Sequence, residues 1–431
     1  MELIHVFVLA LSFAALLLLG VPISFAIGIA TIVTMLMSID PMPAFTTVAQ
    51  QMATGLDSFA LLAIPFFIFA GLLMNRGGIA RRLIDLAKVI VGGLPGGMAF
   101  VTILACMLFG AISGSAVAAA AAIGGFMIPL MVKDGYDRNF SAAVNISSST
   151  TGLIIPPSNI LIVYSFTSGT SVAALFLAGY IPGILIGLGL MVVAGIVSHQ
   201  KNYPTCEPCT LKEAIRIAWK AIPSIFLIIL VMGGIVVGIF TATEASAIAV
   251  AYAFVLAVLI YREVKWSELP GILLDTATTT AIVMLLIGTS IAMSWIMSYE
   301  NIPQNISAGL ISLTDNRFII LLLINVILLA VGTFMDMTPA VLIFTPIFLP
   351  VAEELGIHPV HFGIFMVTNL CIGLCTPPVG SVLFVGTGIA ETSIMKVIRP
   401  LIPMYAAMVI VLLLIIYVPW LSLFLPRLFG Y

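Results

Sequence analysis

Two proline pairs, Pro156-Pro157 and Pro377-Pro378, interrupt long apolar stretches of this 431-residue chain. A proline pair inside a helix removes two backbone donors and leaves carbonyl groups upstream without their helical partners. Lipid cannot satisfy these carbonyls, so each break must be buried in protein or line a polar cavity. Freed backbone oxygens of this kind can coordinate a hard cation such as Na⁺.

Two short polar segments lie in the apolar stretches before these breaks. Ser113-Gly-Ser115 offers hydroxyls and free N–H groups that can hold an anion or supply a cation ligand, unless it serves only close packing. Asp336 is an intramembrane carboxylate, which is costly and marks a functional site. It can balance a cation, bind a substrate hydroxyl or carry a proton. Capping a helix that begins at Thr338-Pro339 is the structural alternative.

These oxygen-rich positions give two sets of candidate ligands. The predicted sodium ligands lie at the breaks and hairpin tips: Ser113, Gly152, Ile155, Pro156, Gly332, Gly373, Thr376 and Val379. The predicted substrate ligands are the side chains of Ser115, Asn159, Asp336 and Thr338. For a single polar residue such as Asn159, an interhelical hydrogen bond is the alternative. No arginine or lysine falls at this depth, so hydroxyls and helix N-termini would have to hold an anionic substrate.

The breaks belong to an internal repeat. The proline pairs are 221 residues apart, as are Pro129 and Pro350, and Gly110 and Gly332 are 222 apart. Breaks at corresponding positions of two halves are typical of the ion and substrate site of a secondary transporter.

The elements that position these residues are predicted to be membrane helices. The chain is 62% hydrophobic and only 8% charged, whereas a soluble domain carries about 25% charged residues. Spans of about 20 apolar residues are predicted at 3–20, 22–39, 57–75, 140–166, 172–198, 220–240, 245–261, 272–298, 358–388 and 402–425. Two further stretches, 96–130 and 317–350, are broken near the middle and are predicted to be re-entrant hairpins.

Charge sets the predicted orientation. With the N-terminus outside, all of the 16 basic residues except Arg317 and Arg427 fall on one face, which is therefore cytoplasmic. Both termini are then outside, and the halves are inverted. The predicted fold is an all-α polytopic inverted repeat of five spans plus one hairpin each, as in alternating-access carriers. The first repeat covers 1–200 with its hairpin on the cytoplasmic side, and the second covers 221–431 with its hairpin on the exterior side. A cytoplasmic loop at 201–220 contains an amphipathic helix.

Other classes of function fit less well. An ATP-driven pump needs a Gly-Lys-Ser/Thr segment, and no lysine here follows a glycine. A serine hydrolase needs a base within reach, and the four histidines fall near membrane edges.

Cys206 and Cys209 have metal-like spacing without a second pair, so we expect an incidental pair and no cofactor beyond Na⁺ as coupling ion. The net charge of −2 does not indicate a nucleic-acid partner. A passive channel or assembly subunit is the alternative class.

The motifs resemble those of a known family. Phe109-Gly-Ala-Ile-Ser-Gly-Ser115, Gly152-Leu-Ile-Ile-Pro-Pro-Ser158 and Gly373-Leu-Cys-Thr-Pro-Pro-Val-Gly380, with Gly135-Tyr136 and the segment 175–183, are similar to the large membrane subunit of TRAP (tripartite ATP-independent periplasmic) transporters. The resemblance spans nearly the whole chain. It implies a non-enzymatic importer of small organic acids in a bacterial inner membrane, driven by a sodium gradient.

The resemblance also implies partners and a mechanism. The family works with a small four-helix membrane subunit and a periplasmic substrate-binding protein, both expected as separate polypeptides here. It implies an elevator motion and sodium sites at the junctions of hairpins and broken helices. Sialic acid is the favoured substrate, with a C4-dicarboxylate or sugar acid as the alternative, and coupling to protons is the alternative to sodium.

Overall fold

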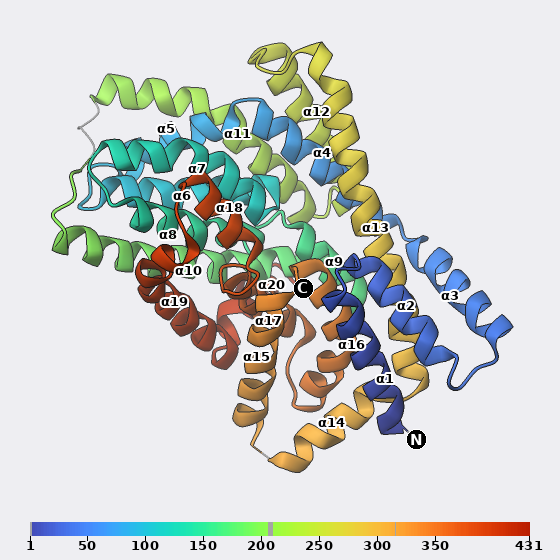
Figure 1. The fold of residues 1–431 in the computed structure, drawn as a ribbon. Helices are drawn as coiled ribbons and strands as arrows, with labels where there is room; N and C mark the ends of the chain where they lie inside the picture. The colour runs from blue at the N-terminus through green and yellow to red at the C-terminus, as the bar shows by residue number, and fades with distance from the viewer. Residues whose placement is uncertain (1, 206–209, 315) are drawn as a thin grey trace.

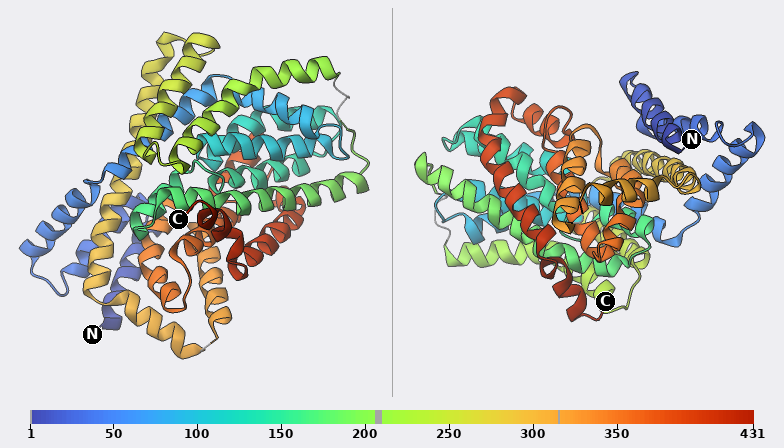
Figure 2. Two further views of the ribbon diagram at one scale, coloured as in Figure 1. Left: turned by 180° about the vertical axis from the view of Figure 1, so that it is seen from behind. Right: turned by 90° about the horizontal axis from the view of Figure 1, so that it is seen from below.

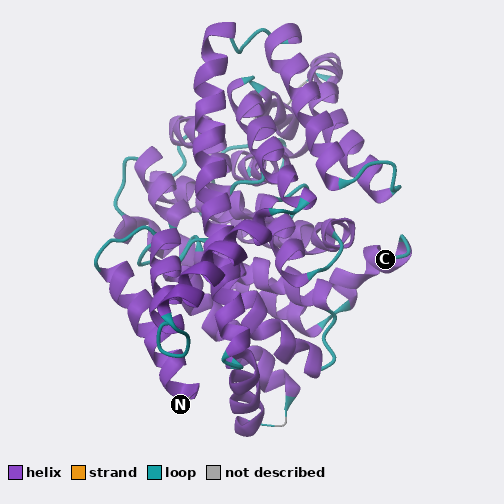
Figure 3. Cartoon of the chain, turned by 90° about the vertical axis from the view of Figure 1, so that its right-hand side faces the viewer, coloured by secondary structure: helices purple, strands orange, loops and turns teal. Residues whose placement is uncertain are grey.

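The computed structural model describes residues 2–205, 210–314 and 316–431, and within these ranges the chain contains helices and no strand (Figure 3). Nine helices of this part of the chain are long and apolar enough to cross a membrane. The predicted all-α membrane fold is therefore confirmed. Cys206 and Cys209, the predicted incidental pair, lie outside the described residues.

The helices follow one another in two comparable series (Figure 1). The first series is α1 (Glu2–Leu18), α2 (Ile23–Met35), α3 (Pro41–Leu56), α4 (Ala63–Arg76), α5 (Ile79–Val91), α6 (Gly97–Ser113), α7 (Ala116–Lys133), α8 (Arg138–Ser149), α9 (Asn159–Ser168) and α10 (Val172–Gln200). The second is α11 (Leu211–Val236), α12 (Ala242–Phe254) with a π-helical turn at Val255–Ile260, α13 (Leu269–Tyr299), α14 (Ile302–Leu313), α15 (Arg317–Phe334), α16 (Met337–Glu354), α17 (Pro359–Gly373), α18 (Ser381–Ile389), α19 (Ile394–Tyr417) and α20 (Trp420–Leu428).

Both predicted hairpins are present. Helices α6 and α7 pack against each other and reverse direction at Gly114, whose positive φ of 60° favours glycine. Helices α15 and α16 likewise pack together and reverse at 335–336. Both predicted breaks are present as well. A 3-10 turn (Thr150–Leu153) and an irregular segment separate α8 from α9, and residues 374–380 separate α17 from α18.

The two halves differ where the first half has two helices and the second has one. A shift of 221 residues relates α3 and α4 to the single 31-residue helix α13. Asp57 and Ser58 end α3 in non-helical conformations, and such side chains compete for backbone hydrogen bonds. The matching residues in α13 are Thr278 and Thr279, and Thr279 donates its hydroxyl to the carbonyl of Asp275 one turn earlier (2.9 Å), so the helix continues.

Three predicted boundaries were wrong. Helices α3 and α14 occupy 41–56 and 302–313, which were predicted to be connections because polar residues and prolines interrupt their apolar pattern. Helix α11 runs unbroken through Pro223, so the amphipathic segment and the span predicted from residue 220 are one helix. The predicted span 402–425 straddles two helices, because Pro419 follows the end of α19 and precedes α20.

The helices form two packed groups. Helix α13 packs against α2, α3 and α4, and α12 packs against α4 and α11. The hairpins and broken helices pack on one another and on α10 and α19. Helices α1–α3 lie at one edge of the molecule, beside α13 (Figure 2). The long helix α13 also contacts α16, so it lies between the two groups.

Candidate functional site

Each hairpin touches its broken helix at a pair of glycines. A Cβ atom added to Gly110 of α6 would lie 2.4 Å from the Cα of Gly152, in the first break. A Cβ added to Gly373 at the end of α17 would lie 2.6 Å from the Cα of Gly332 in α15. The backbones therefore meet directly, which only glycine allows. These contacts hold each hairpin against the broken helix of its own half.

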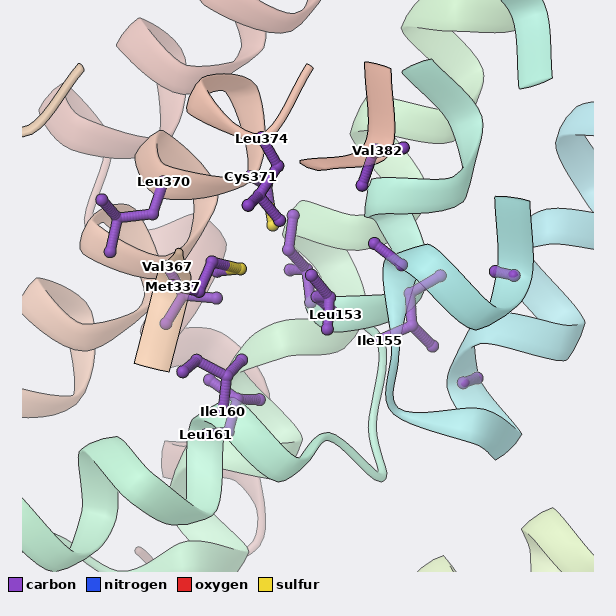
Figure 4. Packing of buried hydrophobic residues seen from close by; sticks show 14 of the residues in the cluster. Leu153, Ile155, Ile160, Leu161, Met337, Val367, Leu370, Cys371, Leu374 and Val382 are labelled. Carbon is purple, nitrogen blue, oxygen red and sulfur yellow. The ribbon is translucent and has the colours of Figure 1, made fainter. Parts of the chain in front are cut away.

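The two breaks also meet each other. The thiol of Cys371 donates to the carbonyl of Thr150 (3.5 Å), and the thiol of Cys375 donates to the carbonyl of Ile146 (3.3 Å). Leu153 from the first break and Leu374 from the second gather in the same apolar layer (Figure 4). The first irregular segment is thus buried in protein, as the lack of lipid partners for its carbonyls requires, whereas Pro378 and Val379 in the second are exposed.

A cavity of about 320 Å³ lies where the hairpin tips, the breaks, α4 and α13 converge. Its volume is at the lower end of that of small-molecule sites. Residues from the first turn of four helices line it: Ala116 of α7, Asn159 of α9, Met337 of α16 and Ser381 of α18. Helix N-termini carry partial positive charge and free N–H groups. The cavity can therefore hold an anion, although none of the described residues lining it is basic.

Two polar atoms beside this cavity lack a partner. Asn159 Oδ1 and Ser381 Oγ are both buried and accept or donate no hydrogen bond within the described chain, and both residues line the cavity. Buried polar groups in folded proteins are nearly always hydrogen-bonded. The two atoms are thus available to a polar ligand or to water.

Asp336 is the one charged side chain among the described residues that line the cavity. It occupies the position before α16 but makes no side-chain capping bond, and its side chain is exposed. Asp336 therefore stands at the N-cap position that the structural alternative predicted, but without a side-chain bond that caps α16. A free carboxylate in a cavity suited to anions needs a cation or a proton to neutralise it.

The predicted residues separate into two locations. All four predicted substrate residues, Ser115, Asn159, Asp336 and Thr338, line the cavity. Among the predicted sodium residues only Ser113 does so. The others do not line the cavity and belong to the glycine contacts or to the breaks: Gly152, Ile155, Pro156, Gly332, Gly373, Thr376 and Val379.

Several oxygen atoms in and beside the second break take part in hydrogen bonds, and two carbonyl oxygens lie close together. The Thr376 hydroxyl donates to the carbonyl of Ile372 (2.7 Å), and the backbone N–H of Val379 donates to the carbonyl of Thr333 in α15 (3.2 Å). The carbonyl oxygens of Leu374 and Thr376 both lie close to Gly380: a Cβ there would be 3.0 and 2.8 Å from them. Two backbone oxygens therefore converge at the end of this break.

The sequence did not predict three polar residues of the cavity: Asn75, Thr279 and Ser381. Asn75 and Thr279 belong to α4 and α13, whose approach is a matter of tertiary packing. Ser381 follows the second break directly and is the first residue of α18, as Asn159 is the first residue of α9 in the first half. That position was a usable signal for Ser381.

The cavity lies near the basic end of the helices that border it. Arg76 follows Asn75 at the end of α4 and pairs with Asp275 of α13 at 2.7 Å. Asp275 is one helical turn before Thr279. The cavity is therefore about one turn from the face that carries most of the basic residues.

Comparison with known proteins assigns the family. The family model described as "Tripartite ATP-independent periplasmic transporter, DctM component" matches residues 10–421. The chain is a TRAP transporter large membrane subunit. This family consists of transporters and not of enzymes, and its members work with a small membrane subunit and a periplasmic binding protein. The predicted resemblance is confirmed.

Individual relatives of this TRAP subunit cover nearly the whole chain. It is similar to the uncharacterized protein YgiK of Salmonella typhimurium, at 56% identity over 420 residues, 97% of this chain and 96% of that protein. It is 41% identical over 374 residues to the C4-dicarboxylate TRAP transporter large permease protein DctM of Pseudomonas aeruginosa, which is 87% of this chain and 88% of that one.

A solved structure has the same fold. The YdaH transporter of Alcanivorax borkumensis superimposes with a TM-score of 0.65 over 88% of this chain and 89% of that one, at 15% sequence identity. At this identity the likeness concerns the fold alone.

Proposed function

We propose that this chain imports a small organic acid into the bacterial cytoplasm, coupled to the inward movement of sodium ions. It resides in the inner membrane with both termini in the periplasm. It works with a small four-helix membrane subunit and receives its substrate from a periplasmic binding protein. The observation that carries the proposal is the convergence of four helix N-termini and a free carboxylate on one cavity.

The electrostatics of the cavity support coupling to a cation. The N-termini favour a carboxylate substrate, but Asp336 repels one. A cation bound at the adjoining breaks would offset this repulsion, so anion and cation bind better together than separately. The carbonyl oxygens of Leu374 and Thr376 come together near Gly380 in the second break, and backbone oxygens of this kind suit Na⁺.

The substrate is proposed at the level of a class. Relatives are named as permeases for C4-dicarboxylates at 41% identity, and for 2,3-diketo-L-gulonate and sialic acid at 38% each. An isethionate permease is also 41% identical, and this chain covers 65% of its length. Because these identities are so similar, sialic acid is not favoured over a C4-dicarboxylate. The shared chemistry is a small acid anion.

The test is uptake into proteoliposomes that contain the chain with its small membrane subunit, with the periplasmic binding protein added to the medium. Radiolabelled succinate, N-acetylneuraminate and isethionate are supplied separately under an inward sodium gradient. We expect saturable uptake of one of them, lost when potassium replaces sodium. Uptake driven by a pH gradient alone would assign coupling to protons at Asp336. Non-saturating flux with ohmic current would indicate a channel.

A further inference from the structure

The first turns of α11 carry an apolar row that no part of the described chain covers. Leu211, Ile215 and Trp219 lie four residues apart, so their side chains share one face of the helix. They are 78%, 61% and 75% exposed. Further along α11 the same row continues with three more exposed side chains: Ile222, Phe226 and Ile229. The exposed apolar face therefore runs without interruption from the start of the helix into its membrane-crossing part.

A basic row lies beside this apolar row. Lys212, Arg216 and Lys220 are also four residues apart, and all three are exposed. None of them forms an ion pair within the described chain. The one acidic residue of this segment, Glu213, accepts hydrogen bonds from the backbone N–H and the hydroxyl of Thr210 (3.1 and 2.7 Å) and so caps the helix. The three positive charges therefore face solvent or a partner of opposite charge.

Helix α11 is longer than the membrane core is thick. Its 26 residues extend about 39 Å, whereas the hydrocarbon core is about 30 Å thick. Its first turns (light green) lie across the end of the molecule at which α13 begins, transverse to the course of α13 (Figures 1 and 2). A segment transverse to a membrane-spanning helix is parallel to the membrane surface.

The packing of α11 holds the two rows outward. Helix α5 packs along α11 on its protein side. Pro223 has no N–H, so the carbonyl of Trp219 lacks its helical partner, which allows the helix to bend there. The Tyr252 hydroxyl of α12 donates to the carbonyl of Pro223 (3.0 Å) and ties this point to the rest of the protein.

We infer that residues 211–220 bind anionic phospholipids of the leaflet next to the face that carries most of the basic residues. The basic row pairs with lipid phosphates. The apolar row enters the boundary between headgroups and acyl chains, as in other amphipathic helices that lie in the membrane surface. A lipid matches both rows at once, because it joins a negative headgroup to an apolar tail. The inference goes beyond the proposed function and does not depend on which acid or ion is transported.

The test measures which lipid touches Trp219. Trp266→Phe, Trp295→Phe and Trp420→Phe together make Trp219 the sole tryptophan of the chain. The chain is reconstituted into vesicles of equal amounts of phosphatidylglycerol and phosphatidylcholine, with one or the other brominated, since bromine quenches tryptophan fluorescence on contact. Brominated phosphatidylglycerol should quench Trp219 roughly threefold more strongly than brominated phosphatidylcholine. Raised salt should weaken this preference without any substitution.

Two pairs of substitutions separate this site from general attraction to basic protein. Arg216→Gln with Lys220→Gln should abolish the preference while quenching by both lipids persists. Lys396→Gln with Arg399→Gln is the matched control, because it removes one lysine and one arginine from exposed positions of α19 that are predicted to lie on the same face. This control should keep the full preference.

Three results would overturn the inference. The first is equal quenching of Trp219 by the two brominated lipids, and the second is a preference that survives Arg216→Gln with Lys220→Gln. The third is loss of quenching by both lipids when a tryptophan-free small membrane subunit is reconstituted with the chain, which would make this face a subunit interface. Uptake of an organic acid is measured separately, so each of these results leaves the proposed function standing.

Discussion

Ser115 and Asp336 hold equivalent positions 221 residues apart, each immediately before the second helix of its hairpin. Ser115 accepts a hydrogen bond from the backbone N–H of Ala118 at 3.2 Å and so caps α7. Asp336 makes no such bond at the start of α16. One hairpin therefore uses its polar residue to stabilise a helix, and the other leaves a carboxylate free to face the cavity.

Asp336→Asn should weaken sodium coupling without loosening the fold. The substitution keeps the size of the side chain and removes its charge. Because the carboxylate caps no helix, the free energy of unfolding should change by less than about 0.5 kcal/mol. Loss of a charge-assisted contact to a cation should raise the sodium concentration for half-maximal uptake at least tenfold, which corresponds to about 1.4 kcal/mol. Uptake as a function of sodium concentration measures this.

Ser115→Ala is the matched comparison for Asp336→Asn. It removes an N-cap and should cost about 1 kcal/mol of stability, measured by thermal unfolding in detergent. The contrast between the two variants is the test. Wild-type sodium dependence in Asp336→Asn, or equal losses of stability in both variants, would contradict the assignment of the free carboxylate.

The glycine contacts predict that alanine substitutions at different glycines change the stability of the protein by different amounts. Gly110→Ala and Gly373→Ala each place a Cβ within 2.6 Å of a facing backbone atom. The backbones must then separate, and overpacking of this kind costs typically 1–3 kcal/mol. Gly125→Ala is the control, since no atom lies within 4 Å of its Cβ position in α7, and alanine there improves helix propensity. Thermal unfolding should show a loss for the first two variants and none for Gly125→Ala.

Most of the fold followed from local signals in the sequence. Proline pairs, glycines and the 221-residue interval identified the breaks and hairpins, because these residues act on the backbone where they stand. Helices α3 and α14 were missed, since their short, mixed patterns do not differ from those of polar connections. The continuous course of α11 through Pro223 had no local signal, because proline usually marks a helix boundary.

The site was predictable to the extent that it lies at the tips and breaks. Ser115, Asn159, Asp336 and Thr338 line one cavity, as their positions beside those breaks predicted. Thr279 was not predictable, because nothing in its own sequence environment shows which side of α13 faces the hairpins.

The orientation of the chain predicts an accessibility pattern. Lys201 follows α10 and Ser312 lies near the end of α14, and both side chains are exposed. In a background without native cysteines, Ser312→Cys should react with a membrane-impermeant maleimide in spheroplasts. Lys201→Cys should react only after the membrane is disrupted, because the proposed orientation puts the basic face in the cytoplasm. The reverse pattern would invert the assigned orientation and place both termini inside.

Side-chain hydroxyls of Tyr405 and Ser158 donate hydrogen bonds to carbonyls in the two breaks and should stabilise them. The Tyr405 hydroxyl donates to the carbonyl of Cys375 in the second break, and the Ser158 hydroxyl donates to the carbonyl of Leu153 in the first, at 2.5 Å. Tyr405→Phe should leave a buried carbonyl without a partner, at a cost of about 1–3 kcal/mol. Tyr417→Phe is the control, because its hydroxyl bonds the Phe318 carbonyl at an exposed position where water can replace it. Thermal unfolding in detergent compares the two variants.

If the breaks hold sodium, added sodium should stabilise Tyr405→Phe less than it stabilises Tyr417→Phe or wild type, since the distorted break binds the ion more weakly. Equal stabilisation by sodium in all three proteins would separate the second break from the ion site.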